Sequence, residues 1–424
     1  MPRVGGYVTR TRIVSRTMML LQERSYHSLG LDEIIRYCGA SKGAFYFHFR
    51  SKIELAEAVI EMYSNTIPPT ISACFAGRDW KDGVETWLKV FIGARKGTRA
   101  FGAALTRVSH QLMQGNHSFA LAVRLSIKST ESALRNILMA RGLSYEVADR
   151  KSATWSALIE GHTLRFLVAG RPACVDDLRR DMRALKDAQL KFLPAELVPG
   201  APFQGADMEE SRLLEQQKKS EIPIDIVDEQ STIISGNRRR EAGARRREIV
   251  NAAAEVFWRH GYSATSLKEL SRASGVPKGS MHAYLGAKRG LALAVLERYE
   301  RSSERLLERA FESGTWRGAI EALYKALKAG GLVGHVLGCP VGNMGLEFVN
   351  TDAELAARAA ALLEKTEMRF AQAVAKYGRS GASARPLAAT AVALTEGHMA
   401  RMVMYSDLDP VEEWREDMIA LLSA

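Results

Sequence analysis

The sequence predicts an all-α protein built from two tandem units, each a three-helix head followed by a helical bundle. Apolar residues recur at the spacing of helices in both halves of the chain, and the alternation typical of strands is absent. The second half also repeats the first half in register. A chain of 424 residues is longer than one core usually fills, which agrees with more than one domain.

The repeat keeps one offset of 236 residues. Arg10, Ile13, Glu33, Gly39, Lys42-Gly43, Trp80 and Glu160-Gly161-His162 recur as Arg246, Ile249, Glu269, Gly275, Lys278-Gly279, Trp316 and Glu396-Gly397-His398. Because this period is too long for a solenoid, we interpret it as two whole domains. The predicted division is a head at 1–56, a bundle at 57–190, a linker at 191–244, a second head at 245–292 and a second bundle at 293–424. The linker prediction rests on its prolines, an acidic run and a final arginine run.

In the first unit, the apolar spacing predicts helices over 10–24, 31–38 and 42–49, with a glycine turn at 39–41. Ser51-Lys-Ile-Glu54 has the pattern of a capping box and opens the next helix. Further helices are predicted over 82–96, 101–114, 119–141, 146–168 and 175–191.

In the second unit, a helix is predicted over 244–260, with Gly261 in the left-handed position that ends it. Ser266-Leu-Lys-Glu269 is a capping box that opens a short helix. After the turn Gly275-Val-Pro, Pro277 is expected at the first position of a helix that runs to Leu285, and a long helix follows from about Ala287. The first unit has Gly30 in place of the cap Ser266, and the second has Ala287 in place of the cap Ser51.

In both heads, two short helices joined by a tight glycine turn follow a longer helix, which is the helix-turn-helix arrangement. The segments GASKGAFYFHFRSKIEL at 39–55 and GVPKGSMHAYLGAKRGL at 275–291 resemble the signature of the TetR family of regulators. The first segment is similar to the γ-butyrolactone receptor branch of that family. The segment GCPVGNMGLEF at 338–348 is similar to a glycine–cysteine motif in the ligand domains of some members.

The resemblance implies which residues face DNA, since the second short helix of the motif enters the major groove. Lys52 and Lys288 are expected to meet phosphate at helix N-termini. The full set comprises Lys42, Gly43, Ala44, Tyr46, Phe47, His48, Lys52, Thr265, Ser266, Lys278, Gly279, Ser280, His282, Ala283, Tyr284 and Lys288.

The resemblance also implies a helical pocket whose small-molecule effector favours the state that does not bind DNA. The candidate lining residues are Trp87, His110, Met113, His162, Phe166, Tyr324, His335, Cys339, Met344, Phe348 and His398. An interface role competes for His162 and His398, because their helices are expected to pair. Residues 119–143 lack the tryptophan usual in γ-butyrolactone receptors, so a different effector, or none, is expected.

These observations predict a sequence-specific, double-stranded-DNA-binding transcriptional regulator, with ligand-released repression as the expected mode. Members of the family pair their last two helices as homodimers, and those helices correspond to about 146–191 and 382–423 here. We expect the two units of one chain to pair instead, giving a pseudo-dimer on an asymmetric, pseudo-palindromic operator. A homodimer of chains is the alternative.

Composition narrows the class of protein further. The net charge of +11 and the pI of about 9.5 favour an anionic partner, either nucleic acid or a membrane surface. No apolar stretch of ~20 residues occurs, so no membrane span is expected. Four cysteines far apart suggest neither a zinc site nor a disulfide framework, and no cofactor is expected. The basic N-terminus lacks a signal-peptide core, so we expect a cytoplasmic, nucleoid-associated protein.

An enzyme is a competing interpretation, because Gly39-Ala-Ser41-Lys-Gly43 formally matches the nucleophile elbow G-x-S-x-G. That elbow must follow a strand, whereas this segment lies between two short predicted helices, so no enzymatic activity is expected. Two non-enzymatic functions also stay open. A nonspecific architectural protein would bind random duplexes equally, and a helical scaffold would show no salt-dependent DNA binding.

Overall fold

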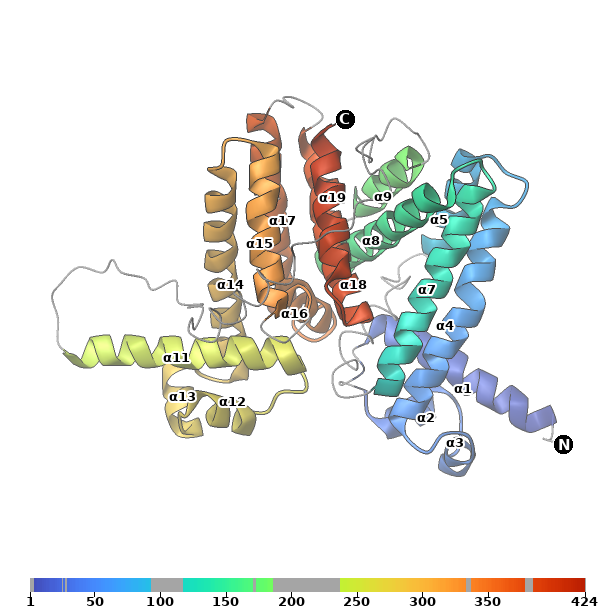
Figure 1. The fold of residues 1–424 in the computed structure, drawn as a ribbon. Helices are drawn as coiled ribbons and strands as arrows, with labels where there is room; N and C mark the ends of the chain where they lie inside the picture. The colour runs from blue at the N-terminus through green and yellow to red at the C-terminus, as the bar shows by residue number, and fades with distance from the viewer. Residues whose placement is uncertain are drawn as a thin grey trace, which may run out of the picture.

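The computed structural model describes residues 4–24, 26, 29–92, 117–170, 173–185, 237–332, 337–377 and 384–423, and every regular element within them is a helix. The first unit consists of α1 (Val4–Glu23), α2 (Leu31–Tyr37), α3 (Lys42–His48), α4 (Lys52–Phe75), α5 (Trp80–Ile92), α7 (His117–Met139), α8 (Tyr145–Ala169) and α9 (Ala173–Ala184). The second consists of α11 (Asn237–His260), α12 (Leu267–Ser274), α13 (Lys278–Leu285), α14 (Lys288–Phe311), α15 (Trp316–Leu332), α16 (Pro340–Phe348), α17 (Ala353–Lys376), α18 (Ala384–Tyr405) and α19 (Asp409–Ser423). The predicted all-α class with two tandem units is confirmed (Figure 1).

Two predicted boundaries fall inside continuous helices. The head–bundle boundaries at 56 and 292 lie within α4 and α14, so each head shares a helix with its bundle. The last residues of the predicted linker, 237–244, belong to α11, so the arginine run is helical and that part of the prediction is wrong. The rest of the linker and the predicted helix over 101–114 lie outside the described residues.

The helix ends follow local chemistry. The full capping box of Ser266 and Glu269 is present, with hydrogen bonds of 3.2 and 2.6 Å. Ser51 accepts a hydrogen bond from the amide of Glu54, whose carboxylate in turn accepts one from the amide of Arg50. Gly261 has φ of +82°, as predicted for the end of α11, and Gly275, in the predicted turn, has φ of +67° and caps α12. Pro277 precedes α13 as its cap instead of being its first residue.

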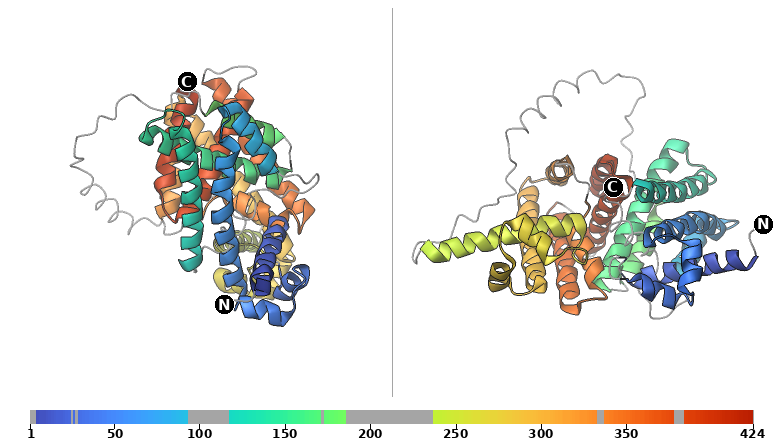
Figure 2. Two further views of the ribbon diagram at one scale, coloured as in Figure 1. Left: turned by 90° about the vertical axis from the view of Figure 1, so that its right-hand side faces the viewer. Right: turned by 90° about the horizontal axis from the view of Figure 1, so that it is seen from below.

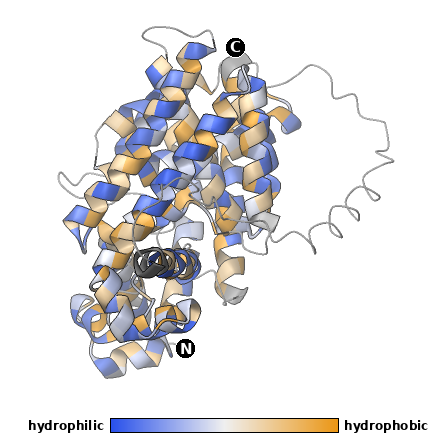
Figure 3. Ribbon diagram, turned by 90° about the vertical axis from the view of Figure 1, so that its left-hand side faces the viewer, coloured by the Kyte–Doolittle hydropathy of each residue, from blue (hydrophilic) through white to orange (hydrophobic). Residues whose placement is uncertain are grey.

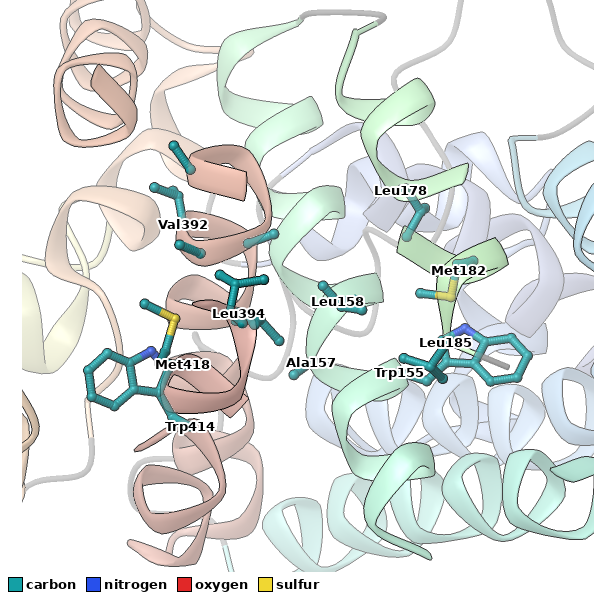
Figure 4. Close-up of a cluster of buried hydrophobic side chains, with 14 of the residues drawn as sticks. Trp155, Ala157, Leu158, Leu178, Met182, Leu185, Val392, Leu394, Trp414 and Met418 are labelled. Atoms are coloured by element: carbon teal, nitrogen blue, oxygen red, sulfur yellow. The ribbon is translucent and has the colours of Figure 1, made fainter. Parts of the chain in front are cut away.

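The two units share one central core. Trp155, Leu158 and Met182 of the first unit belong to the same apolar cluster as Trp414 and Met418 of the second (Figure 4). Hydrophobic and hydrophilic residues both occur along the bundle helices (Figure 3), and apolar side chains from several of these helices enter this cluster. Helices α8 and α18 form the most extensive contact between the units.

The α8–α18 crossing depends on a reciprocal pair of glycines. A Cβ atom on Gly161 would lie 1.8 Å from the carbonyl oxygen of Ala393, and one on Gly397 would lie 1.8 Å from that of Ala157. Gly161 and Gly397 are repeat equivalents, and so are Ala157 and Ala393, so the contact is the same when read from either unit. This is the geometry of a two-fold interface, made here within one chain.

Each interface helix also reaches toward the other unit's head. The last turns of α8 and α18 enter the apolar clusters that hold the buried faces of the second and first head, respectively. The residues are the repeat equivalents Leu164, Leu167 and Val168 on α8 and Ala400, Val403 and Met404 on α18. Both heads lie on the same side of the paired helices (Figures 1 and 2).

Candidate nucleic-acid interface and effector cavity

In the first head, α3 is anchored by one face and exposes the other. Phe45 and Phe49 are buried with their ring centroids 5.7 Å apart. On the opposite face, the side chain of Tyr46 is 54% exposed and that of Phe47 is 80% exposed. Apolar rings this open to water are unusual on a small protruding helix, and they mark a surface suited to a partner.

The start of α3 carries a basic residue with a weakly held partner. Lys42 forms an ion pair with Asp32 at 2.9 Å, and both side chains are largely exposed. Hydrogen bonding to Asp32 raises the pKa of Lys42, so the ammonium stays charged. Ser41 caps the helix by accepting a hydrogen bond from the amide of Ala44, and a Cβ atom on Gly43 would meet nothing within 4 Å.

The second head repeats this arrangement with different side chains. Met281 is buried at the position equivalent to Phe45. The exposed residues of α13 are Lys278, Gly279, Ser280, His282, Ala283 and Tyr284. The two heads therefore present helices of similar placement but unlike surface chemistry, and all six of these predicted residues face solvent.

Two lysines predicted to meet phosphate, Lys52 and Lys288, contact the protein itself. Lys52 donates a hydrogen bond to the Tyr26 carbonyl, and Lys288 lies 4.3 Å from the centroid of the Tyr262 ring. Burial lowers the pKa of Lys52 to about 8. Both ammonium groups are thus half-buried and already have a partner, and phosphate contact stays a prediction.

Thr265 does not face solvent, so its predicted contact with DNA is wrong. Its side chain is 3% exposed and donates a hydrogen bond of 2.6 Å to the carbonyl of Gly261. Ser266 is exposed, but its hydroxyl is engaged as the cap of α12. His48 and Ala44, which were also predicted to face DNA, are half-buried on α3.

His162 and His398, predicted as pocket residues or interface residues, belong to the interface. His162 Nε2 lies 2.9 Å from Asp181, which accepts a hydrogen bond from Thr390 of the other unit. The equivalent His398 lies 3.0 Å from Asp417, which accepts one from Thr154. Burial lowers the pKa of His162, which favours its neutral ring.

Two arginines extend this network across the interface. Arg165 pairs with Glu367 of the second unit at 2.6 Å, and the equivalent Arg401 pairs with Glu131 of the first unit at 3.0 Å. Both guanidinium groups are almost fully buried. A buried charge needs a partner, so these pairs tie the register of the two units together.

Most of the other predicted pocket residues are packed in the core. Trp87 stacks on Phe91 with centroids 4.7 Å apart, and Phe166 packs against the apolar cluster of the second head. Met344 and Phe348 are buried on α16, and Tyr324 donates a hydrogen bond to Glu412. His110, Met113 and His335 lie outside the described residues.

A cavity of about 170 Å³ lies within the second bundle, among α14, α15, α17 and α18. Of the predicted pocket residues that the structure describes, only Cys339 lines it. Sequence reasoning missed Glu396, which also lines the cavity and is 5% exposed. Burial raises the pKa of Glu396 to about 7. The recurrence of Glu160-Gly-His as Glu396-Gly-His was the signal that could have identified it.

Other chemistries find no support among the described residues. They contain no group of three or more His, Cys, Asp or Glu side chains placed to hold a metal ion. None of their helices is long and apolar enough to cross a membrane. Ser41, from the formal elbow motif, caps α3 and follows α2 in place of the strand that a nucleophile elbow requires.

Comparison with known families identifies the two heads. Residues 13–59 and 249–295 each match the family of bacterial regulatory proteins called tetR. Residues 307–417 match the C-terminal domain of LmrA/YxaF-like transcriptional regulators. The first match covers the helix-turn-helix of each unit, and the second covers the bundle that contains the cavity.

Individual relatives agree with the family matches. The chain is 30% identical to the transcriptional regulator AcuR of Cereibacter sphaeroides over 31% of this chain and 62% of AcuR. It is 29% identical to the HTH-type transcriptional regulator LmrA of Bacillus subtilis over 40% of this chain and 96% of LmrA. A solved regulatory protein TetR from Rhodobacter sphaeroides is 27% identical, with a TM-score of 0.38, over 40% of this chain and 93% of that one.

LmrA thus corresponds to a single unit, since the match spans nearly all of LmrA but 40% of this chain, whereas this chain contains two. The tetR-family match occurs once in each half, in the same register as the internal repeat. The chain is a TetR-family regulator in which the helix-turn-helix unit occurs twice in tandem.

Proposed function

We propose that this chain binds a specific operator as a single-chain pseudo-dimer, represses transcription there, and leaves the DNA when an effector binds. The observation that carries the proposal is the reciprocal α8–α18 crossing at Gly161 and Gly397. A two-fold interface made inside one chain lets that chain present two reading heads without a second copy. The same-side placement of the heads supports the same mode (Figure 2).

The exposed residues of α3 and α13 are the proposed reading surfaces. The first head exposes Tyr46 and Phe47 on α3, whereas the second exposes His282, Ala283 and Tyr284 on α13. Unlike side chains read unlike base edges, so the operator is expected to have two different half-sites. Their centres are expected ~34–36 Å apart or at a multiple of that spacing. A kinship of the first head with the γ-butyrolactone receptor branch is part of this proposal and rests on KGAFYFHF alone.

Selection of bound sites from random duplex DNA, followed by native mass spectrometry of the complex, tests the proposal. We expect one chain per duplex and two dissimilar half-sites at a fixed spacing. Two chains on a perfect palindrome would contradict the pseudo-dimer. Equal affinity for every duplex would identify an architectural protein, and an absence of salt-dependent binding would identify a scaffold.

A further inference from the structure

The two bundles differ at equivalent positions around the cavity. Leu323 and Leu327 line it in the second unit, and their repeat equivalents in the first unit are Trp87 and Phe91. Ala391, on the neighbouring turns of α18, corresponds to Trp155. In the first unit, Trp87 stacks on Phe91 and its centroid lies 5.9 Å from that of Trp155. At these three positions the first bundle therefore has an aromatic ring where the second has a smaller aliphatic side chain.

The cavity has an apolar interior and a polar outer end. Leu307, Phe370 and Trp414 are buried and form its inner wall. Glu300 and Lys365, which pair at 2.9 Å, line it from α14 and α17 and are partly exposed, which indicates an entrance between these helices. A cavity of about 150 Å³ holds a benzene ring. At about 170 Å³, this one suits a single ring with a short substituent.

One oxygen atom of a buried carboxylate that lines this cavity lacks a hydrogen-bond partner. The Oε2 atom of Glu396 is inaccessible to water and has no hydrogen-bond partner among the described residues. The thiol of Cys339 lies beside the carboxylate, but a thiol is a weak donor. A Cβ atom on Gly342 would lie 3.1 Å from Oε2, so any larger residue at this position would crowd the carboxylate. A buried carboxylate paired with a weak donor is unfavourable, and a ligand in the cavity with a strong donor or a positive charge would stabilise it.

We propose that the effector site lies in the second unit alone and takes one compact apolar amine per chain, with Glu396 binding the ammonium group. The ring of the ligand packs among Leu323, Phe370 and Trp414, which are three of the apolar lining residues. The role of the ligand as an effector rests on the proposed function. The existence of the binding site rests on the cavity alone.

The position of Glu396 connects this site to the interface. It directly precedes Gly397, the glycine of the helix crossing. Its carboxylate also interacts electrostatically with Arg165 of the first unit, which pairs with Glu367 across the interface. An ammonium group on Glu396 changes the charge that Arg165 faces. Arg165 lies in sequence between Leu164 and Leu167, whose side chains enter the apolar cluster of the second head. A change in the charge beside Arg165 can therefore shift α8 under that head and alter the spacing of the two heads.

Calorimetric titration of the full chain with benzylamine, and with toluene as its isostere without a donor, tests the site. We expect one benzylamine per chain and at least tenfold weaker binding of toluene. Glu396→Gln is expected to weaken benzylamine at least tenfold and to leave toluene unchanged. Two sites per chain, no benzylamine binding to the folded chain, or equal loss of both probes in Glu396→Gln would overturn the proposal.

Two variants introduce the side chains of the first unit into the cavity. Leu323→Trp and Leu327→Phe are each expected to abolish the binding of both probes, with folding checked by circular dichroism. Leu125→Phe is the matched control, because it makes the same kind of change at a side chain that is 57% exposed on α7. Benzylamine binding retained in both folded cavity variants would place the site elsewhere and overturn the proposal.

Operator binding, measured in parallel without benzylamine, separates the two proposals. Benzylamine binding by a chain that selects no DNA site would contradict the proposed function and leave the cavity site standing. Operator binding by a chain that does not bind benzylamine would contradict this inference alone.

Discussion

Gly43 and Gly279, the glycines near the start of the recognition helices, are not required by the packing of the protein itself. A Cβ atom at either position would meet nothing within 4 Å, and neither residue has a positive φ. Glycine within a helix destabilises it by roughly 0.5–1 kcal/mol relative to alanine. Its presence in both heads therefore points to a requirement outside the chain, which we attribute to the close approach of the DNA backbone.

Gly43→Ala is expected to raise the free energy of unfolding by up to ~1 kcal/mol while weakening operator binding about tenfold, a loss of ~1.4 kcal/mol. Urea denaturation and fluorescence anisotropy with a labelled operator measure the two effects. Gly330→Ala is the control, because Gly330 is an exposed glycine of α15 with open space around it and lies outside the heads. If Gly43→Ala binds the operator like the wild type, the residue does not lie against DNA.

Glu396 predicts a pH dependence of stability. Burial raises its pKa from 4.5 to about 7 in the folded chain, with Cys339 and Arg165 as the neighbours that oppose the shift. A raised carboxyl pKa stabilises the fold fully below pH 4.5, and this contribution is lost as the pH rises through about 7. Glu396→Gln has no carboxyl group to titrate at this position and avoids this loss. The free energy of unfolding of the variant minus that of the wild type should therefore rise by up to about 3 kcal/mol between pH 4.5 and 8. Urea denaturation at both pH values measures the difference, and a constant difference would contradict the assigned pKa.

At the scale of helices, the heads could be predicted from the sequence because their ends are set by local chemistry. Ser266, Glu269 and Gly275 cap or end their helices through their own side chains or backbone, and the repeat supplies each head with an independent second example of the pattern. Thr265 was assigned wrongly because a threonine beside a cap looks like a surface residue, whereas its hydroxyl bonds back to Gly261.

The cavity could not be predicted in this way. Leu323 and Leu327 are indistinguishable in sequence from ordinary core leucines, and only the packing of α14, α15, α17 and α18 leaves space between them. His162 likewise gave no indication of its partner, because the packing of α9 against α8 brings Asp181 to it, and only the pairing of the two units brings Thr390 to Asp181. Features that depend on tertiary contacts do not appear in a local pattern.

The α8–α18 crossing leads to a prediction of its own. Gly161→Ala would place a Cβ atom 1.8 Å from a backbone carbonyl oxygen, which cannot rotate away, so the two helices must separate. We expect the free energy of unfolding to fall by ~1–3 kcal/mol and Gly397→Ala to have a similar effect, since the contact is reciprocal. Urea denaturation measures both. A stability gain like that expected of Gly330→Ala would show that the helices do not cross at this glycine.

At the scale of the whole molecule, the duplication makes the two halves mutually dependent. The end of α8 enters the cluster of the second head, and the end of α18 enters that of the first. A movement of either interface helix therefore changes the packing beneath the head of the opposite unit. With one chain holding both halves, the two recognition helices are free to diverge, as Tyr46-Phe47 and the equivalent His282-Ala283 have done, while the pairing of the two units is retained.

This divergence predicts that each head protects its own half of the operator. Phe47→Ala and Tyr284→Ala remove exposed rings, so each should leave stability within ~0.5 kcal/mol and unfold neither head. Footprinting of the selected operator should then show that Phe47→Ala loses protection of one half-site and Tyr284→Ala loses protection of the other. The salt dependence of the remaining binding should be unchanged, since neither substitution removes a charge. If each variant instead weakens both halves equally, two chains must be sharing a symmetric site, and recognition of the operator by a single chain is ruled out.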